Sequence, residues 1–493
     1  MKIGQTSLVV FLSKILGAAI GFVGTVYFAR VLGAEVLGLY AMVVALVSWL
    51  VLFGKIGFTS AITKRLSEGD DQGAYMIAGV LAIATVATVL AIGVLLGRPY
   101  VEAYTSGVEA YVAVSVVWFV IAIAVAKLLF SVVRAFLQGQ HLVHIAGGLE
   151  PAKSGAKTII QVGLVAAGYG LLGMFVGYVV GVIVVALFGL VFVSFRPQRP
   201  TRKHVRSLFD YAKFSWLGGL KSRAFNDVDI VILGALVPAS LVGIYAVAWS
   251  LSTFLNLFGS AISKSMFPEI SERSATESLD AVSGYVEDSL AFAGLVAIPG
   301  LVGGTLLADR LLRIYGPEFT QGTEVLWLLL VAVVCYNFFK QLLNALNAVD
   351  RPDLAFRANA VFIVSNVALN VVLIVQFGWV GAAIASIVSV GIGLAVSYVM
   401  VTSLLPFTPP LAEISKQVAA ALAMGFVVVS AEFAIETLTA FDHNFAIVSV
   451  LVALGAATYG LVLLAISARF RTTIARNLPI EHPLISRVLG PSR

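Results

Sequence analysis

Apolar runs of about twenty residues recur along the whole chain, and this feature restricts the possible fold more than any other. The first run starts at residue 8 and the last ends at residue 467, with only short polar connections between runs. A segment of about 20 apolar residues is long enough to cross the hydrocarbon core of a bilayer as an α-helix. The alternating ten-residue segments of a transmembrane β-barrel do not occur. The sequence therefore predicts an all-α polytopic membrane protein.

We expect about fourteen transmembrane helices. The composition agrees, since 60% of the residues are hydrophobic and only 12% are charged, about half the charged share of soluble domains. Two pairs of segments, five with six and eleven with twelve, are joined by glycine-containing turns. The expected segments are 8–29, 36–56, 73–96, 109–130, 151–169, 171–194, 214–236, 240–262, 284–307, 323–346, 357–377, 380–404, 416–437 and 445–467.

The basic residues are distributed unequally between the two sets of loops. With the N-terminus in the cytoplasm, the opposite side of the membrane holds only Arg30, Arg98, Arg310 and Arg313. Because cytoplasmic loops collect Lys and Arg, we expect a multi-pass protein of the cell membrane with both termini cytoplasmic. The same rule accounts for the net charge of +6, so no nucleic-acid partner is expected. The predicted cytoplasmic cations are Lys64, Arg65, Arg134, Arg196, Arg199, Arg202, Lys203, Arg206, Arg273, Arg351, Arg469, Arg471, Arg476, Arg487 and Arg493.

The two halves of the chain resemble each other. The stretch "LGAEVLGLYAMVVAL" (32–46) aligns with "VPASLVGIYAVAWSL" (237–251), so that Gly38 falls on Gly243. Farther on, "YGLLGMFVGYVVG" (169–181) resembles "FGWVGAAIASIVS" (377–389). Because the matches occur in the same order, they predict a duplicated six-helix unit with parallel halves. The expected domains are an N-terminal lobe at 1–200, a C-terminal lobe at 201–405, two additional helices at 406–467 and a basic cytoplasmic tail at 468–493.

Charged side chains inside the predicted spans are candidates for function, because each costs about 2.5–3.5 kcal/mol at a helix centre. Lys14 and Lys221 lie about two turns into their spans, and we expect them to face the protein interior. Those near span ends, such as Lys55 and Lys264, have the alternative of reaching the headgroups. The set predicts a cationic cavity for an anion such as phosphate. Its members are Lys14, Lys55, Lys127, Lys153, Lys157, Lys221, Arg223, Lys264, Lys340 and Arg357.

The acidic candidates for function come from the seventh span, within "SWLGGLKSRAFNDVDIVILGAL" (215–236). Arg223 and Asp227 are an i,i+4 pair that can neutralise itself. The alternative is that Asp227 and Asp229 bind a coupling cation. A row of amides in spans ten and eleven has two interpretations as well, helix-to-helix hydrogen bonds or contacts to a hydroxyl-rich substrate.

Patterns for covalent catalysis or metal binding are absent from the sequence. The stretch "AKSGAKT" (152–158) lacks the spacing of a phosphate-binding loop. His141 and His144 have only Glu150 nearby, which is too few ligands for a metal site. The outer loops are short. We therefore expect no enzyme, no cofactor and no metal, but a protein that moves a substrate.

Several of these stretches resemble a known family. "FARVLGAEVLGLYA" (28–41) resembles the first loop motif of the polysaccharide flippases of the multidrug/oligosaccharidyl-lipid/polysaccharide exporter superfamily. "FGKIGFTSAITKRLSE" (53–68), and Arg134 with "FLQGQH" (136–141), resemble the stretches after the second and fourth spans. The resemblance covers essentially the whole chain. It implies alternating-access translocation of a polyprenyl-(di)phosphate-linked oligosaccharide to the outer leaflet, for cell-surface polysaccharide or glycoprotein glycan assembly.

The resemblance also implies a site and partners. In the family, spans one, two, seven and eight line a central cationic cavity, and spans thirteen and fourteen form a groove for the lipid tail. The implied partners are the lipid-linked oligosaccharide, membrane lipids and a glycan polymerase, ligase or oligosaccharyltransferase. The implied phosphate contacts are Lys14, Lys55, Lys221, Arg223 and Lys264.

Three alternatives stay open on the sequence. A peptidoglycan-precursor flippase would share most of these features. A cation-coupled drug or metabolite antiporter of the same superfamily would favour acidic cavity residues and twelve spans. A non-transporting scaffold for glycan assembly would tolerate loss of the charges inside the spans.

Overall fold

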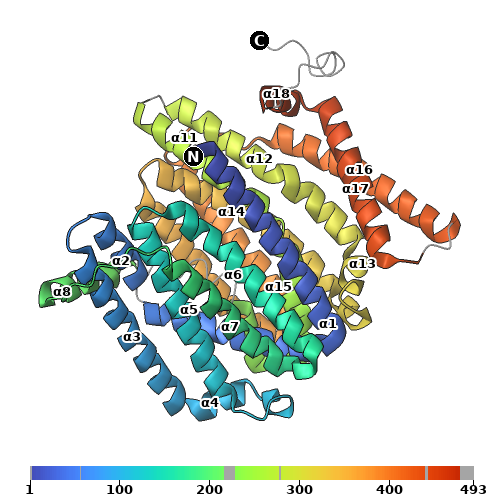
Figure 1. Cartoon of the computed structure of the whole chain (residues 1–493). Coiled ribbons are helices and arrows are strands. Elements are labelled where there is room, and N and C mark those ends of the chain that lie inside the picture. Colours follow the sequence, from blue (N-terminus) through green and yellow to red (C-terminus); the bar gives the residue numbers. More distant parts are fainter. Residues whose placement is uncertain (1–2, 56, 216–227, 277–278, 439–441, 478–493) are drawn as a thin grey trace. The chain divides into compact units, whose positions relative to one another are not determined.

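The computed structural model of the chain describes residues 3–55, 57–215, 228–276, 279–438 and 442–477 (Figure 1). These residues form helices and no β-strand, which confirms the predicted all-α class. Within them, nine helices are long and apolar enough to cross a membrane, or ten if the bent pair at 239–253 and 258–274 forms one span. The predicted count of fourteen spans stays a prediction.

Contacts divide the chain into two units. The first comprises Met1–Ala246 with Ile374–Trp379, and the second comprises Val247–Leu373 with Val380–Arg493. The domain boundaries predicted from the repeat stay a prediction. The helices up to the first division are α1 (Ile3–Lys55), α2 (Phe58–Ser67), α3 (Gln72–Leu96), α4 (Arg98–Tyr104), η1 (Val108–Ala110), α5 (Val116–Gly139), α6 (Val143–Leu164), η2 (Val165–Tyr169), α7 (Gly170–Leu190) and α8 (Arg202–Ser215).

The remaining elements begin with α10, which contains the division at residue 246. Residues 228–236, before α10, are also helical. The elements are α10 (Ala239–Thr253), α11 (Asn256–Thr276), α12 (Leu279–Leu306), α13 (Ala308–Arg313), η3 (Pro317–Gly322), α14 (Thr323–Ala348), α15 (Pro352–Thr402), α16 (Leu411–Leu438), α17 (Asn444–Ile466) and α18 (Ala468–Asn477).

Two of the helices, α1 and α15, are much longer than one membrane crossing. At 1.5 Å per residue, the 53 residues of α1 extend to about 80 Å, against about 30 Å of hydrocarbon. Each helix is broken by a glycine with positive φ, Gly33 at 81° and Gly378 at 59°. Only glycine adopts such angles without strain. The break at Gly378 falls within the glycine-containing turn predicted between segments eleven and twelve.

Three glycines of α7 bring its backbone against α6. Gly173, Gly177 and Gly181 recur every four residues and so lie on one face of the helix. A Cβ atom would lie 2.8 Å from Cα of Gln161 at Gly177 and 2.5 Å from Cα of Lys157 at Gly181. Small residues of this kind allow close helix packing in membranes. The approach places Lys157 and Gln161 directly against α7.

The two copies of the repeated motif also meet, inside the first unit. A Cβ atom on Gly38 of α1 would lie 2.9 Å from the backbone nitrogen of Gly243 of α10, and nearer still to the Ala239 carbonyl oxygen. A Cβ atom on Gly243 would lie 2.9 Å from the nitrogen of Gly38, and nearer still to the Ala34 carbonyl oxygen. In the repeat, Gly38 aligns with Gly243 and Ala34 aligns with Ala239, so the two helices make the same contact with each other. Such a reciprocal contact is expected where two related segments meet at a pseudo-two-fold axis.

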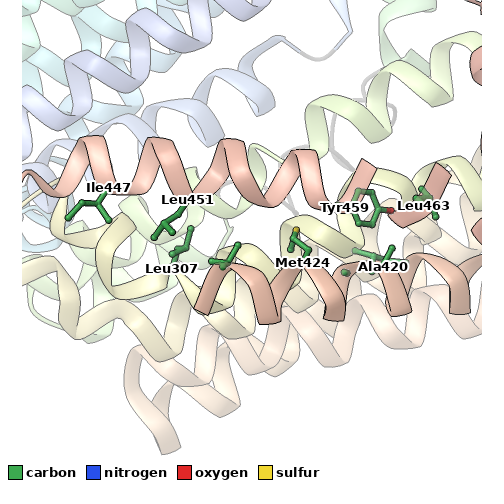
Figure 2. Close-up of a cluster of buried hydrophobic side chains, with 10 residues drawn as sticks. Leu307, Ala420, Met424, Ile447, Leu451, Tyr459 and Leu463 are labelled. Carbon is green, nitrogen blue, oxygen red and sulfur yellow. The ribbon is translucent and has the colours of Figure 1, made fainter. Parts of the chain in front are cut away.

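The helices after the repeat, α16 and α17, pack against each other and against the second unit through a buried apolar cluster (Figure 2). Its members come from α16, α17 and α12, with Leu307 between α12 and α13. Side chains fill this interface, and the cavity beside Gln417 and Arg469 has a volume of only about 10 Å³. The lipid groove implied by the resemblance stays a prediction. The labelled members of the cluster are Leu307, Ala420, Met424, Ile447, Leu451, Tyr459 and Leu463.

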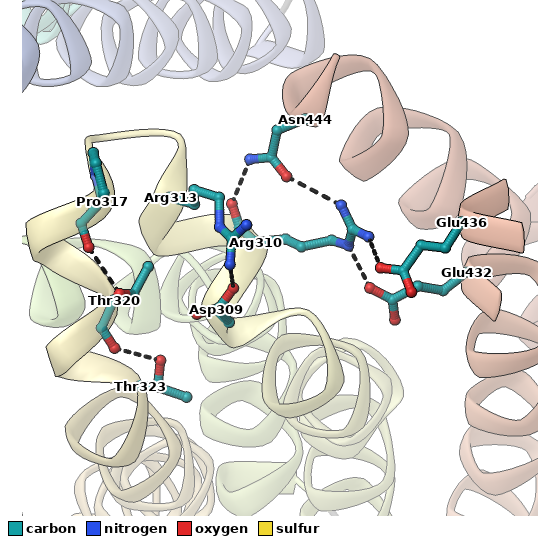
Figure 3. Close-up of polar contacts among 9 residues, drawn as sticks. All are labelled: Asp309, Arg310, Arg313, Pro317, Thr320, Thr323, Glu432, Glu436 and Asn444. Atoms are coloured by element: carbon teal, nitrogen blue, oxygen red, sulfur yellow. Dashed lines mark hydrogen bonds and ion pairs between the residues drawn. The ribbon is translucent and has the colours of Figure 1, made fainter. Parts of the chain in front are cut away.

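Polar contacts attach both ends of α16 to the second unit. At one end, the Arg310 guanidinium of α13 donates hydrogen bonds to Glu432 and Glu436 of α16 (Figure 3). The side-chain nitrogen of Asn444 on α17 donates to the Arg310 carbonyl oxygen at 2.9 Å. At the other end, Gln417 Nε2 donates to the Ala291 carbonyl oxygen of α12 at 2.9 Å. The two helices are therefore part of the second unit.

Candidate functional site

Four of the predicted cavity residues have no described side chain. Lys221, Arg223 and Asp227 fall in the segment 216–227, which is outside the described residues. Lys14 and Lys55 lie on α1, but their side chains are not among the described ones. Their roles as phosphate contacts therefore stay predictions.

Asp229 and Lys264 are described. Asp229 is buried, at 4% exposure, and its Oδ2 accepts a hydrogen bond of 2.6 Å from the Tyr245 hydroxyl of α10. This contact keeps a carboxyl group hydrogen-bonded at a buried position, where an unsatisfied one would be costly. The coupling role of Asp229 stays a prediction. Lys264 lies exposed on α11.

Four helices of the first unit bring two lysines to one tyrosine. Lys127 of α5 donates a hydrogen bond of 2.6 Å to the Ser48 hydroxyl of α1. Its ammonium lies 5.7 Å from the ring centre of Tyr178 on α7. The Lys157 ammonium of α6 lies 5.3 Å from the centre of the same ring. Both lysines are partly buried, whereas Tyr178 is only 7% exposed.

A corresponding arrangement occurs in the second unit. Lys340 of α14 donates a hydrogen bond of 2.8 Å to the Ser260 hydroxyl of α11. Lys264 lies one turn past Ser260 on α11. Beside them, Gln341 Nε2 donates to the Ser263 hydroxyl at 3.0 Å and to the Gly259 carbonyl oxygen at 3.2 Å. For this amide, the helix-to-helix interpretation is the one observed.

The two lysine–serine contacts occupy matching segments of the predicted repeat. Ser48 and Ser260 lie in its second and eighth segments, and Lys127 and Lys340 in its fourth and tenth. Each contact also has a second lysine beside it. We call these groups the lysine pairs, Lys127/Lys157 and Lys264/Lys340. All four cations stand out in the sequence, but their relation does not. Ser48 and Ser260 are 212 residues apart and Lys127 and Lys340 are 213 apart, rather than the 205 of the aligned motif.

The lysine pairs favour an anionic ligand. Among the residues that the structure describes, Lys157, Lys264 and Lys340 form no ion pair with a carboxylate. A serine hydroxyl or an aromatic face compensates a buried ammonium only in part, about 0.5–2 kcal/mol for a cation–π contact. A second lysine in each group increases the uncompensated positive charge. A phosphate would relieve it, because ammonium groups bind phosphate as point charges.

Comparison with known proteins shows the family of the chain. Residues 3–274 match the family described as polysaccharide biosynthesis protein. The chain belongs to the polysaccharide biosynthesis protein family. The probable flippase AglR of Haloferax volcanii is 33% identical over 482 residues, which cover 97% of this chain and 98% of AglR. The probable low-salt glycan biosynthesis flippase Agl15 of the same organism is 28% identical over 402 residues, which cover 79% of this chain and 81% of Agl15.

Solved structures resemble this member of the polysaccharide biosynthesis protein family in fold. The inward closed conformation of the lipid II flippase MurJ has a TM-score of 0.74 at 16% identity, covering 95% of this chain and 99% of MurJ. An inward-facing multidrug transporter of the MATE family has a TM-score of 0.60 at 14% identity, covering 78% of this chain and 95% of the transporter. Together with the family match, these likenesses confirm the resemblance to flippases that was drawn from the sequence.

Proposed function

We propose that the chain translocates a polyprenyl-phosphate- or diphosphate-linked oligosaccharide from the cytoplasmic to the outer leaflet of the cell membrane. The product would supply the assembly of cell-surface polysaccharide or glycoprotein glycans. The family and the flippase relatives support transport of this kind. The observation that carries the proposal is the lysine pair in each unit, since a cationic site inside a membrane protein suits the phosphate of such a substrate.

The physical task of the protein would be to shield the phosphate and sugars from about 30 Å of hydrocarbon. An ammonium group of a lysine pair would offset desolvation of the phosphate, because opposite charges attract more strongly where the dielectric constant is below that of water. The polyprenyl chain would remain in the bilayer. Alternating access of the two lobes would then carry the headgroup across, with no covalent bond made or broken.

The remaining sequence predictions are part of the same proposal. Lys14, Lys55, Lys221, Arg223 and Lys264 would contact phosphate, and both termini would lie in the cytoplasm. Asp227 and Asp229 would be candidates for ion coupling. A glycan polymerase, ligase or oligosaccharyltransferase would use the product.

The lysine pairs also separate this proposal from one rival, the drug antiporter. A drug antiporter for cationic substrates would need acidic groups where these cations lie. A peptidoglycan-precursor flippase would use the same phosphate chemistry, so the MurJ-like fold does not separate it from our proposal. The chemical identity of the glycan in the transported lipid distinguishes the two.

Deletion of the gene in its host is expected to make a lipid-linked oligosaccharide accumulate on the cytoplasmic side, with loss of the corresponding surface glycan. Mass spectrometry of extracted lipids would identify the sugars and the lipid carrier. Wild-type protein should restore export, whereas Lys14→Ala and Lys221→Ala should insert into the membrane without restoring it. Unchanged surface glycans and lipid-linked sugars in the deletion strain would contradict the proposal. Accumulation of a peptidoglycan precursor instead would establish the closest rival.

A further inference from the structure

A polar cavity between α2 and α5 in the first unit is lined by residues other than those of the lysine pairs. Its volume is about 160 Å³. Since one water occupies about 30 Å³ in the liquid, this space is enough for about five waters or for a tetrahedral oxyanion. The polar groups that line it belong to Thr59, Ser60, Thr63, Ser131, Arg134 and Gln138.

The charge balance around Arg134 is positive. Its Nη1 donates a hydrogen bond to Glu150 on α6, and the other oxygen of Glu150 accepts one from Lys153 at 2.5 Å. Two cations therefore share one carboxylate. Arg134 Nε is buried and has no hydrogen-bond partner in the described part of the chain. A buried unsatisfied donor costs about 1–3 kcal/mol and more if charged, so an acceptor bound to this atom would stabilise the protein.

The other polar lining groups are neutral hydroxyls and one amide, which can both donate and accept. Thr63 and Ser131 donate to carbonyl oxygens of their own helices at 3.0 and 2.8 Å, so these two hydroxyls have local roles. Ser60 and Gln138 make no such bond within the described residues and can donate into the cavity. None of the described lining residues is an Asp or Glu. A guanidinium in a lining without a carboxylate favours an oxyanion over a cation.

The cavity lies near the end of a membrane-spanning helix. Ser131, Arg134 and Gln138 lie in the last turns of α5, which ends at Gly139. The end of a span is at the depth of the lipid headgroups. A phosphate attached to a lipid and a phosphate free in solution can therefore both approach it.

We propose that this cavity is a phosphoryl-binding site. Its ligand is a phosphate carried by an anionic lipid headgroup or dissolved as free phosphate. The planar guanidinium of Arg134 matches the geometry of phosphate oxygens, with Ser60 and Gln138 as further donors. This site goes beyond the proposed transport function, because no residue of either lysine pair lines it.

Thermal unfolding of the purified full-length protein tests the proposal in two arms. The first compares inorganic phosphate with chloride at equal ionic strength in a neutral detergent. The second compares nanodiscs of phosphatidylcholine with nanodiscs that also contain phosphatidylglycerol. In at least one arm, wild-type protein should be stabilised by the phosphate group, since a ligand that binds only the folded state raises its stability. Arg134→Gln should weaken the apparent affinity about tenfold or more.

Two further variants keep the test independent of folding. Ser60→Ala changes an exposed side chain and should lower the affinity severalfold with the unliganded melting temperature unchanged. Arg65→Gln removes the same charge from α2 outside the cavity lining, where Arg65 pairs with Glu68 at 2.8 Å, and should respond like wild type.

A response to inorganic phosphate identifies free phosphate as a ligand, and a response to phosphatidylglycerol alone identifies a headgroup. Absence of any wild-type response, or a full response in Arg134→Gln, overturns the site. Glycan export by these variants is a separate readout, so the transport proposal stands or falls independently.

Discussion

Replacement of both Lys127 and Lys340 with methionine is expected to abolish glycan export, and each single replacement should reduce it more than tenfold. Methionine keeps most of the apolar length of lysine but has no charge. Each lysine is the member of its pair that donates to a serine of a neighbouring helix. A hydrogen bond to a charged group contributes about 1.5–3 kcal/mol, and 1.4 kcal/mol corresponds to tenfold in an equilibrium constant.

Export would be measured as surface glycan in the deletion strain at matched protein levels in the membrane. Lys127→Arg and Lys340→Arg keep the charge and should retain part of the activity. Lys416→Met is the matched control, because Lys416 on α16 pairs with Glu413 at 2.9 Å and belongs to neither lysine pair. It should export normally. Normal export by the double methionine variant would exclude the lysine pairs from transport.

Leucine at Gly38 or Gly243 is expected to destabilise the protein strongly and to stop transport. A Cβ atom at either position would lie within 3.0 Å of backbone atoms of the facing helix. Since backbone does not move aside as a flexible side chain does, α1 and α10 would have to separate. Overpacking of this kind typically costs about 1–3 kcal/mol, occasionally more, and we expect the upper part of that range. The reciprocal geometry predicts similar losses at both positions.

The loss would be measured as the melting temperature of detergent-purified protein and as export at matched levels. Gly38→Ala is the milder form and should also lower the melting temperature. Gly163→Ala is the control, because a Cβ there meets no atom within 4 Å. In a helix interior, alanine is favoured over glycine by about 0.5–1 kcal/mol, so this variant should be neutral or more stable. If Gly38→Ala and Gly163→Ala behave alike, the backbone contact has no energetic importance.

The fold class followed from the sequence because a bilayer permits few solutions. Long apolar runs must form helices there, since every backbone polar group needs a partner within the segment. The helix break at Gly378 could be predicted from the sequence for a related reason. Gly378 stands between two such runs, and its positive φ is a conformation that residues with a Cβ rarely adopt.

The candidate site was only partly predictable. The lysines of both pairs stand out in the sequence, because charges inside apolar spans are rare. Their pairing depends on side chains from helices far apart in the chain, such as Ser48 with Lys127, and sequence separation gives no sign of it. From the sequence, Arg134 was interpreted as an indicator of orientation and as part of a family motif, not as a cavity residue. Its cavity depends on how α2 packs against α5, which no local pattern encodes.

Translocation itself can be measured with the full-length protein in liposomes that contain the lipid-linked oligosaccharide extracted from the deletion strain. A membrane-impermeant glycosidase cleaves only the glycans exposed on the outer surface. Without protein, the inner-leaflet glycans should remain protected. With wild-type protein, we predict that they become cleavable, and that the variant carrying both Lys127→Met and Lys340→Met leaves them protected. Protection of the inner-leaflet glycans in liposomes with folded wild-type protein would contradict the proposed function.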